Sequence, residues 1–168
     1  MAPITERPDM GGYGVPDSTD GLLPWSWAEQ RLVTTRNYWL ATASVDGRPH
    51  VMPVWGQWLI DPDRFVFSCA PTARKARNID ANARVSVAAD DSVEVVVIEG
   101  TASLLEGDAK QVAAAGFGPK YETDPAAADA LVQFYLDHTM FEVVPEVGFG
   151  IIEREEEFQN AATRWRWA

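Results

Sequence analysis

Cysteine and histidine are scarce in this chain of 168 residues, which contains one cysteine and two histidines. The single thiol, Cys69, has no partner for an intramolecular disulfide and leaves no Cys-rich metal site. With only His50 and His138, the ligand spacings that are typical of zinc sites are also missing. We therefore expect no bound metal, and a fold that relies on its apolar core rather than on covalent cross-links.

Long apolar runs and an excess of basic residues are missing as well. No uninterrupted apolar stretch approaches the roughly 20 residues that a membrane-spanning helix needs, and no cationic segment followed by an apolar run marks a signal peptide. The formal net charge of −11 argues against nucleic acid, whose binding requires a basic surface. These absences predict a cytoplasmic protein with neither nucleic acid nor a membrane as its partner.

Familiar catalytic motifs are absent too. The chain has no glycine-rich dinucleotide or nucleotide loop, no H-E-x-x-H and no G-x-S-x-G. No acid–base cluster identifies a catalytic residue, although His50 and Tyr135 are candidates for a proton donor. Hydride transfer through an organic cofactor needs little from a protein beyond positioning and electrostatics. The seven tryptophans suit a site that stacks on a planar ring.

One short basic cluster interrupts this acidic chain. Arg74, Lys75 and Arg77 follow a predicted strand over 63–67, in a segment that reads as a helix over 73–81 with Thr72 as its N-cap. The helix dipole disfavours cations in the first turn, whereas a bound anion would remove the conflict. The cluster therefore predicts a phosphate site. The alternative interpretation is a solvated basic face on an acidic protein.

The chain divides into an N-terminal arm over residues 1–24 and a single domain over residues 25–168. The arm is rich in proline and glycine and shows no periodicity, which predicts an extended segment. Two interpretations of it stay open. It is either a disordered tail or an arm that lies over a partner subunit or the mouth of a site.

Short strands joined by tight turns dominate the domain. Asp46-Gly47 predicts a hairpin between strands over 38–44 and 50–60, and Pro53 predicts that the second of these is an edge strand or carries a bulge. Further strands are predicted over 84–89, 92–105, 141–144, 148–153 and 162–167, and further helices over 26–36, 107–116 and 125–138. A capping box at Ser26–Glu29 and Asp124-Pro125 mark two of the helix starts. The pattern predicts an α+β protein built on an antiparallel barrel.

The order of these motifs resembles the pyridoxamine 5′-phosphate oxidase-like split β-barrel superfamily. The resemblance covers residues 25–168 and rests on the segments 46–55, 65–68, 72–79, 82–87, 98–102 and 163–167. It is strongest for the flavin/deazaflavin-dependent oxidoreductases, in the branch that often uses coenzyme F420. The implied fold is an antiparallel, FMN-binding-like split β-barrel with peripheral helices. The implied assembly is a homodimer with cofactors at the interface.

The resemblance also implies which residues hold the cofactor. Lys75, Arg77 and Asn78 match the family's K-x-R-N phosphate-binding run, with Arg74 adjacent to it. The backbone of the second strand and of the segment after the third would line the ring and ribityl portion: Met52, Pro53, Val54, Trp55, Ser68, Cys69 and Ala70. Trp165 and Arg166 match a terminal Trp-Arg pair that reaches the cofactor region. The chain lacks the Arg-His pattern near the C-terminus that the oxidase proper carries, which argues against vitamin B6 oxidation.

Four functions stay open at this level. The first is hydride transfer between reduced F420 and a small electron-poor organic substrate. The second is an FMN-dependent oxidase or reductase of the same fold. The third is a non-enzymatic binder of a flavin or a tetrapyrrole. The fourth is a dimeric barrel whose basic helix only pairs with acidic residues of its neighbour.

Overall fold

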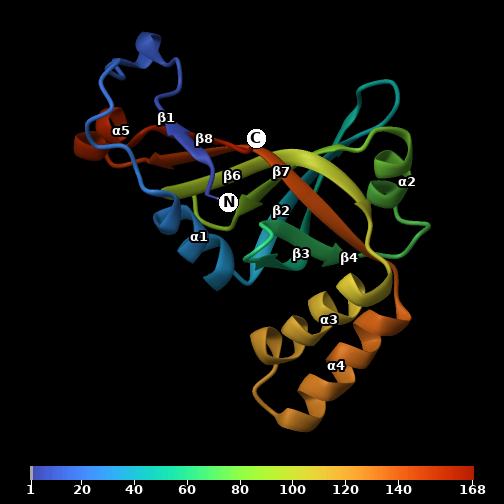
Figure 1. The fold of residues 1–168 in the computed structure, drawn as a ribbon. Coiled ribbons are helices and arrows are strands. Elements are labelled where there is room, and N and C mark those ends of the chain that lie inside the picture. The colour runs from blue at the N-terminus through green and yellow to red at the C-terminus, as the bar shows by residue number, and fades with distance from the viewer. Residues whose placement is uncertain (1) are drawn as a thin grey trace.

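The chain forms an antiparallel β-barrel flanked by helices, as seen in a computed structural model that describes residues 2–168 (Figure 1). The strand order is β1-β8-β7-β4-β3-β2-β5-β6, and a further pairing between β6 and β7 closes the barrel. Strands β2 to β7 make up the barrel, and β8 and β1 extend it from β7. The predicted α+β split β-barrel with peripheral helices is confirmed.

The elements fall into two sets. The strands are β1 (Ile4–Glu6), β2 (Asn37–Ala43), β3 (Pro49–Leu59), β4 (Arg64–Ser68), β5 (Arg84–Ala89), β6 (Glu94–Leu104), β7 (Met140–Ile152) and β8 (Thr163–Arg166). The helices are the 3-10 turn η1 (Gly11–Tyr13), α1 (Trp25–Thr34), α2 (Arg74–Ala81), α3 (Gly107–Tyr121), α4 (Pro125–Asp137) and α5 (Glu155–Ala161). In Figure 1, α3 and α4 form a hairpin below the barrel and α2 covers one of its sides.

Two apolar cores meet at β4. Phe65 and Phe67 point into the barrel and join the larger core, whereas Val66 between them points outward and belongs to the core beneath α3 and α4. All three side chains are fully buried. Because side chains alternate along a strand, β4 can serve both cores only by being apolar at consecutive positions, as it is over 65–67. Its short run of aromatic and β-branched residues meets that requirement.

Helix starts follow apolar packing more than capping chemistry. The helix α1 begins at Trp25, one residue before the predicted cap, so the capping box at Ser26–Glu29 does not form. The ring of Trp25 packs against Trp58 and Trp165, which fixes this start. The helix α2 has Ala73 at its N-cap, so Thr72 does not cap it.

The cap predicted for α4 is confirmed. The carboxylate of Asp124 accepts a hydrogen bond of 2.9 Å from the backbone N–H of Ala127, and Pro125 is the first helical residue.

The C-terminal half differs from the predicted pattern in three elements. One strand, β7, replaces the two strands predicted over 141–144 and 148–153. It passes through Pro145 and Gly148 because its register with β6 shifts at Glu99/Gly100, leaving Glu146 outside the ladder. The helix α3 continues to Tyr121 rather than ending at Gly116, and α5 forms over Glu155–Ala161, where no helix is predicted.

The N-terminal segment contacts the C-terminal strand. β1 pairs with β8, and the Arg7 guanidinium donates to the carbonyl oxygens of Ser18, Asp20, Asn160 and Ala162. The division into an arm over 1–24 and a domain over 25–168 stays a prediction, and residue 1 lies outside the described residues. Within residues 2–168, none of the helices combines the length and the apolar character that a membrane crossing requires. The cytoplasmic location stays a prediction.

Closure of the barrel depends on a glycine in β6, opposite the point where β7 bulges at Glu146. A Cβ at Gly100 would collide with the carbonyl oxygen of Val144 in β7. We predict that Gly100→Ala lowers the free energy of unfolding by about 1–3 kcal/mol, because backbone on both strands must move apart. Gly12→Ala is the matched control, since a Cβ at Gly12 meets nothing within 4 Å. Denaturant unfolding of both variants tests this, and equal stabilities would contradict it.

Candidate functional site

The strand β3 has one free edge over its first half. Residues Pro49–Trp55 pair with β2, but pairing with β4 runs only over Gly56–Leu59. Beyond that point β4 leads through Cys69 and Ala70 toward α2. Within residues 2–168, the outward backbone groups of 49–55 therefore have no strand partner, and we call this segment the open edge of β3. Pro53 lies in this segment, which agrees with the prediction of an edge, because proline has no N–H to donate to a neighbouring strand.

The inward side of the open edge is accessible because β4 does not run beside this part of β3. Met52 lies opposite the buried Leu40 in the register with β2, yet its side chain is 42% exposed. His50, on the same side of the strand, is half-buried, whereas Val54, close to the point where β3 and β4 begin to pair, is buried. The inward face of β3 is therefore accessible along the N-terminal half of the strand and buried along the rest.

The start of α2 lies beside this open edge. Arg74 and Lys75 are its first two residues. Burial lowers the pKa of His50, and the nearby charges of Arg74 and Lys75 lower this pKa further. Lys75 also acts on Cys69 after β4, where burial raises the pKa of the thiol and the cation partly opposes it. The open edge, the end of β4 and the start of α2 therefore surround one region, which we call the α2 site.

The hairpin between β2 and β3 also reaches the α2 site. Gly47 has a φ of +81°, which suits the predicted tight turn. Hydrogen bonds from the Ser44 hydroxyl and the turn backbone hold the pKa of Asp46 below its usual range, and the positive charge of Arg74 adds to this effect. Arg48 lies in the same hairpin.

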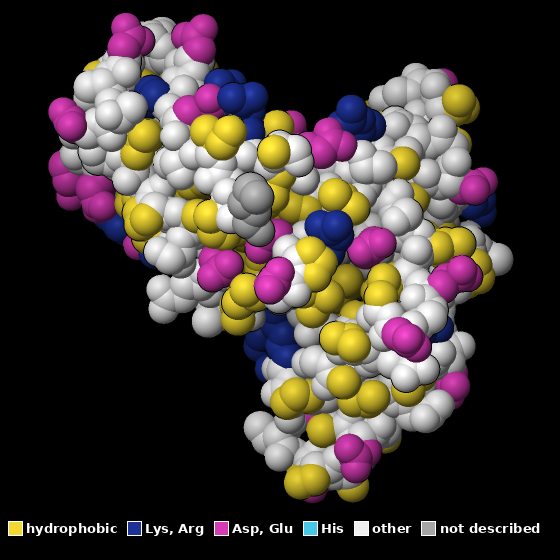
Figure 2. Space-filling view, in the orientation of Figure 1, with side chains coloured by type: hydrophobic (Ala, Val, Ile, Leu, Met, Phe, Trp, Pro, Cys, Tyr) yellow, Lys and Arg dark blue, Asp and Glu magenta, His cyan; other side chains and the backbone are white. Residues whose placement is uncertain are grey.

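Three cations at this site have no side-chain partner in the part of the chain that the structure describes. Among residues 2–168, the side chains of Arg48, Arg74 and Lys75 make neither an ion pair nor a hydrogen bond. Other cations are engaged, such as Arg84 with Glu146 and Arg166 with Glu6. Figure 2 shows acidic side chains spread over the visible face, with basic ones in a few small groups. Unpaired cations at a helix start, in so acidic a chain, favour a bound anion.

Arg77 and Asn78, unlike these three cations, have hydrogen-bond partners within the chain. The Asn78 amide is buried and donates to the Thr42 hydroxyl at 2.9 Å, which ties α2 to β2. The Arg77 guanidinium donates to the Thr72 carbonyl at 3.1 Å and lines a separate cavity of about 480 Å³ between α2, the end of β6 and the start of β7. The structure thus divides the basic run between two sides of α2.

An exposed indole ring lies at the other end of the open edge. Trp55 is 45% exposed and stacks on Tyr121 of α3, with ring centroids 4.5 Å apart and an interplanar angle of 10°. The Tyr121 hydroxyl accepts the Gly56 N–H at 2.8 Å and lies 2.5 Å from the Arg36 carbonyl oxygen. Tyr121 therefore fixes both the ring of Trp55 and the residue where β3 and β4 part.

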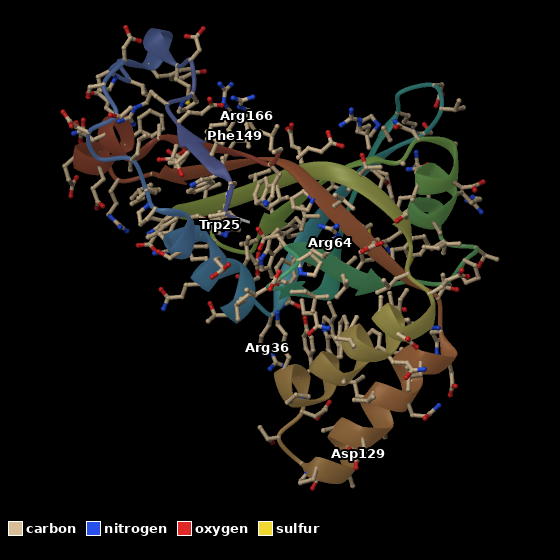
Figure 3. The ribbon with its side chains drawn as sticks, viewed as in Figure 1. Trp25, Arg36, Arg64, Asp129, Phe149 and Arg166 are labelled. Atoms are coloured by element: carbon tan, nitrogen blue, oxygen red, sulfur yellow. The ribbon has the colours of Figure 1, made fainter. Side chains whose placement is uncertain are left out.

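The remaining predicted residues are placed as follows. The Ser68 hydroxyl donates to the Thr139 carbonyl at 2.7 Å, Cys69 is half-buried and Ala70 is exposed. Trp165 is fully buried, 5.5 Å from the Trp25 ring. Arg166 lies on β8 and donates to Glu6 of the neighbouring strand β1 at 2.6 Å (Figure 3). Within one chain these two residues do not border the open edge, and the cofactor roles of all the predicted residues stay predictions.

Sequence reasoning missed Tyr121, although a signal was present. Phe117 and Tyr121 are aromatic residues at i, i+4 spacing, which is typical of a helix face. Pro119 favoured an earlier helix end, but it lies in the last turn of α3.

The chain matches a known family over most of its length. The family model described as pyridoxamine 5′-phosphate oxidase matches residues 28–141. No curated protein matches the chain significantly.

Several solved structures share the fold. A heme binding protein from Mycobacterium smegmatis has a TM-score of 0.59 at 23% identity, covering 77% of this chain and 55% of its own. A conserved hypothetical protein from Mycobacterium tuberculosis has a TM-score of 0.59 at 18% identity, covering 86% and 85%. A pyridoxamine 5′-phosphate oxidase-related, FMN binding protein from Nostoc punctiforme has a TM-score of 0.54 at 17% identity, covering 77% and 81%. At these identities the likeness shows the fold.

His50 reports on the charge of the α2 site. Because burial and two cations lower its pKa, we predict that Lys75→Met raises the pKa of His50, and that inorganic phosphate raises it in the unmodified protein. Titration of the imidazole resonances by NMR measures both shifts. Lys110→Met is the control, because Lys110 lies on α3 and donates to the Leu136 carbonyl. A His50 pKa that responds to neither change would place the two cations elsewhere.

Proposed function

The chain belongs to the pyridoxamine 5′-phosphate oxidase family, and from this premise we propose that it is an oxidoreductase that uses the deazaflavin F420. The proposed reaction is hydride transfer between reduced F420 and a small electron-poor organic substrate. The second candidate is an FMN-dependent oxidase or reductase, and the likeness to an FMN binding protein of the same fold favours it.

One observation carries the proposal. Among residues 2–168, the side chains of Arg48, Arg74 and Lys75 at the α2 site have no partner, and they lie beside a strand edge whose outward backbone groups pair with no strand. A phosphorylated cofactor fits these features, because its phosphate is a counter-ion for the cations and a planar ring system can bond to a free strand edge. Trp55 offers an exposed ring at the far end of the same edge.

The two candidate cofactors place different demands on the cations of the α2 site. A single phosphate suits Arg74 and Lys75, whereas the longer anionic tail of F420 needs further cations. Arg48 is free to supply one from the hairpin, but Arg84 already pairs with Glu146 and is less available. The Asp46 carboxylate near Arg74 opposes a second anion, so the tail would have to pass on the Arg48 side.

Each residue of the α2 site has a limited task in this chemistry. A bound deazaflavin or flavin supplies the hydride transfer itself. Arg74 and Lys75 would hold the phosphate, and the backbone of 52–55 and 68–70 would orient the ring. His50, with its lowered pKa, is neutral near pH 7 and would accept or donate a hydrogen bond at the imidazole rather than add a third charge.

We also propose a homodimer with the cofactor at the interface. Alternate residues of β2 and β3 put Trp39, Val51 and Trp55 on the outer face of the barrel, where they are 46%, 52% and 45% exposed. Large apolar side chains gathered on one face mark an association surface. A second copy of the chain would cover this face and could bring its own Arg166 toward the α2 site.

Lys75 is the first residue to test. We predict that Lys75→Ala weakens cofactor binding by roughly 10- to 150-fold, which corresponds to the loss of one charge-assisted contact of about 1.5–3 kcal/mol. Quenching of F420 and FMN fluorescence by the apo protein measures both affinities. Lys110→Ala is the control, because it removes the same charge from α3.

The two cofactors separate the candidates. Tight F420 binding with weak FMN binding supports the deazaflavin enzyme, and the reverse supports the flavin enzyme. If neither cofactor binds, both proposals are wrong. Tight binding without turnover of any acceptor would instead favour a carrier of a flavin or tetrapyrrole, consistent with the likeness to a heme binding protein.

The proposed dimer can be tested with matched valines. We predict that Val51→Asp shifts the protein from dimer to monomer, because a carboxylate would be buried in an apolar interface. Val112→Asp should leave the dimer intact, since Val112 is exposed on α3 and is not part of the two strands that form this face. Sedimentation velocity distinguishes the two species. A monomeric unmodified protein would contradict the assembly.

A further inference from the structure

Lys120 is an amine held between aromatic rings in the last turn of α3. Its Nζ donates to the Tyr38 hydroxyl at 2.7 Å and lies 4.9 Å from the centroid of the Tyr38 ring and 5.8 Å from that of Tyr121. The side chain is half-buried, and among residues 2–168 no carboxylate forms an ion pair with it. The proposed cofactor site does not use this amine.

A second cation lies next to Lys120. The Arg36 guanidinium is 5.0 Å from the Tyr121 centroid, and it donates to the carbonyl oxygens of Lys120 and Tyr121 at 3.0 and 3.1 Å. Figure 3 shows Arg36 at the lower edge of the barrel, beside the end of α3. The other groups that face Nζ are the Tyr38 and Tyr121 phenols, and burial raises the pKa of both, so they stay neutral.

These surroundings favour the neutral amine. Burial, and then the charge of Arg36, lower the pKa of Lys120 to about 8. At pH 7 about one tenth of such an amine is unprotonated, against roughly one part in 2,500 for an ordinary lysine with a pKa near 10.4. A desolvated amine beside another cation is the usual arrangement of a lysine nucleophile.

We propose that Lys120 is a nucleophilic site that forms an imine with a small carbonyl compound carrying a carboxylate. The amine lone pair attacks the carbonyl carbon, and the carbonyl oxygen takes up a proton lost from nitrogen, giving a carbinolamine. The hydroxyl then leaves as water, taking the second proton from nitrogen, and the C=N bond forms. The Tyr38 hydroxyl, which donates to the Leu32 carbonyl, accepts from Nζ at 2.7 Å and orients the amine.

The chemistry of the surroundings selects this product. The imine can form as a neutral C=N group, which the partly desolvated site beside Arg36 favours over a charged product. A carbamate would put an anion on the same nitrogen, at the helix end that disfavours it. The exposed Arg36 guanidinium is the group that would recognise a carboxylate on the incoming carbonyl compound.

Reductive trapping tests this directly. The chain has three lysines, Lys75, Lys110 and Lys120, so peptide mapping can follow each one. We predict that glyoxylate with cyanoborohydride at pH 7 modifies Lys120 at least about tenfold faster than Lys110 or Lys75. Labelling of Lys120 at the rate of the other two lysines would overturn the proposal.

The role of Arg36 is tested by comparing two aldehydes. In the unmodified protein, glyoxylate should label Lys120 in preference to uncharged acetaldehyde, and Arg36→Gln should reduce this preference by about threefold. The ratio of the two rates cancels any change in the basicity of Lys120 itself. An unchanged ratio would show that Arg36 does not recognise a carboxylate, and the proposed class of carboxylate-bearing substrates would be wrong. Circular dichroism confirms that the variant retains α3, and Arg84→Gln is the control.

Discussion

The structure depends on where β3 and β4 begin to pair. They share a ladder from Gly56 onward, whereas the half of β3 before Gly56 has only β2 as a neighbour. Tyr121 holds this fork by bonding to the backbone of Gly56, and a Cβ at Gly56 would collide with the Phe65 ring. The free strand edge, the accessible Met52 and the proximity of α2 to β3 all follow from this geometry.

Charged side chains are distributed so that the cations beside this fork can bind an anion. In a chain with net charge −11, most arginines have a carboxylate or carbonyl partner, yet Arg48, Arg74 and Lys75 have none among residues 2–168. Asn78 uses its amide to anchor α2 to β2, which fixes the helix start without occupying the cations. The same helix therefore combines a structural polar contact on one side with an anion-attracting end.

The sequence predicted the barrel class, the hairpin at Gly47 and the cationic helix start, because each has a local signal. It did not predict that β7 is one strand, since Pro145 and Gly148 normally end strands and the bulge at Glu99/Gly100 that accommodates them depends on β6. It grouped Arg77 with Lys75, whereas the turn of α2 places them on different sides. Tyr121 and Lys120 were missed because their contacts join α3 to β2 and β3, far apart in the chain.

The double burial of β4 has a further consequence for how the molecule unfolds. Phe65 and Phe67 belong to one core and Val66 to the other, so neither core can open while this strand stays in place. The α3–α4 hairpin is thereby energetically joined to the barrel, although it projects from it. The chain should behave as a single cooperative unit, with the amide protons of β4 exchanging with solvent only through global opening.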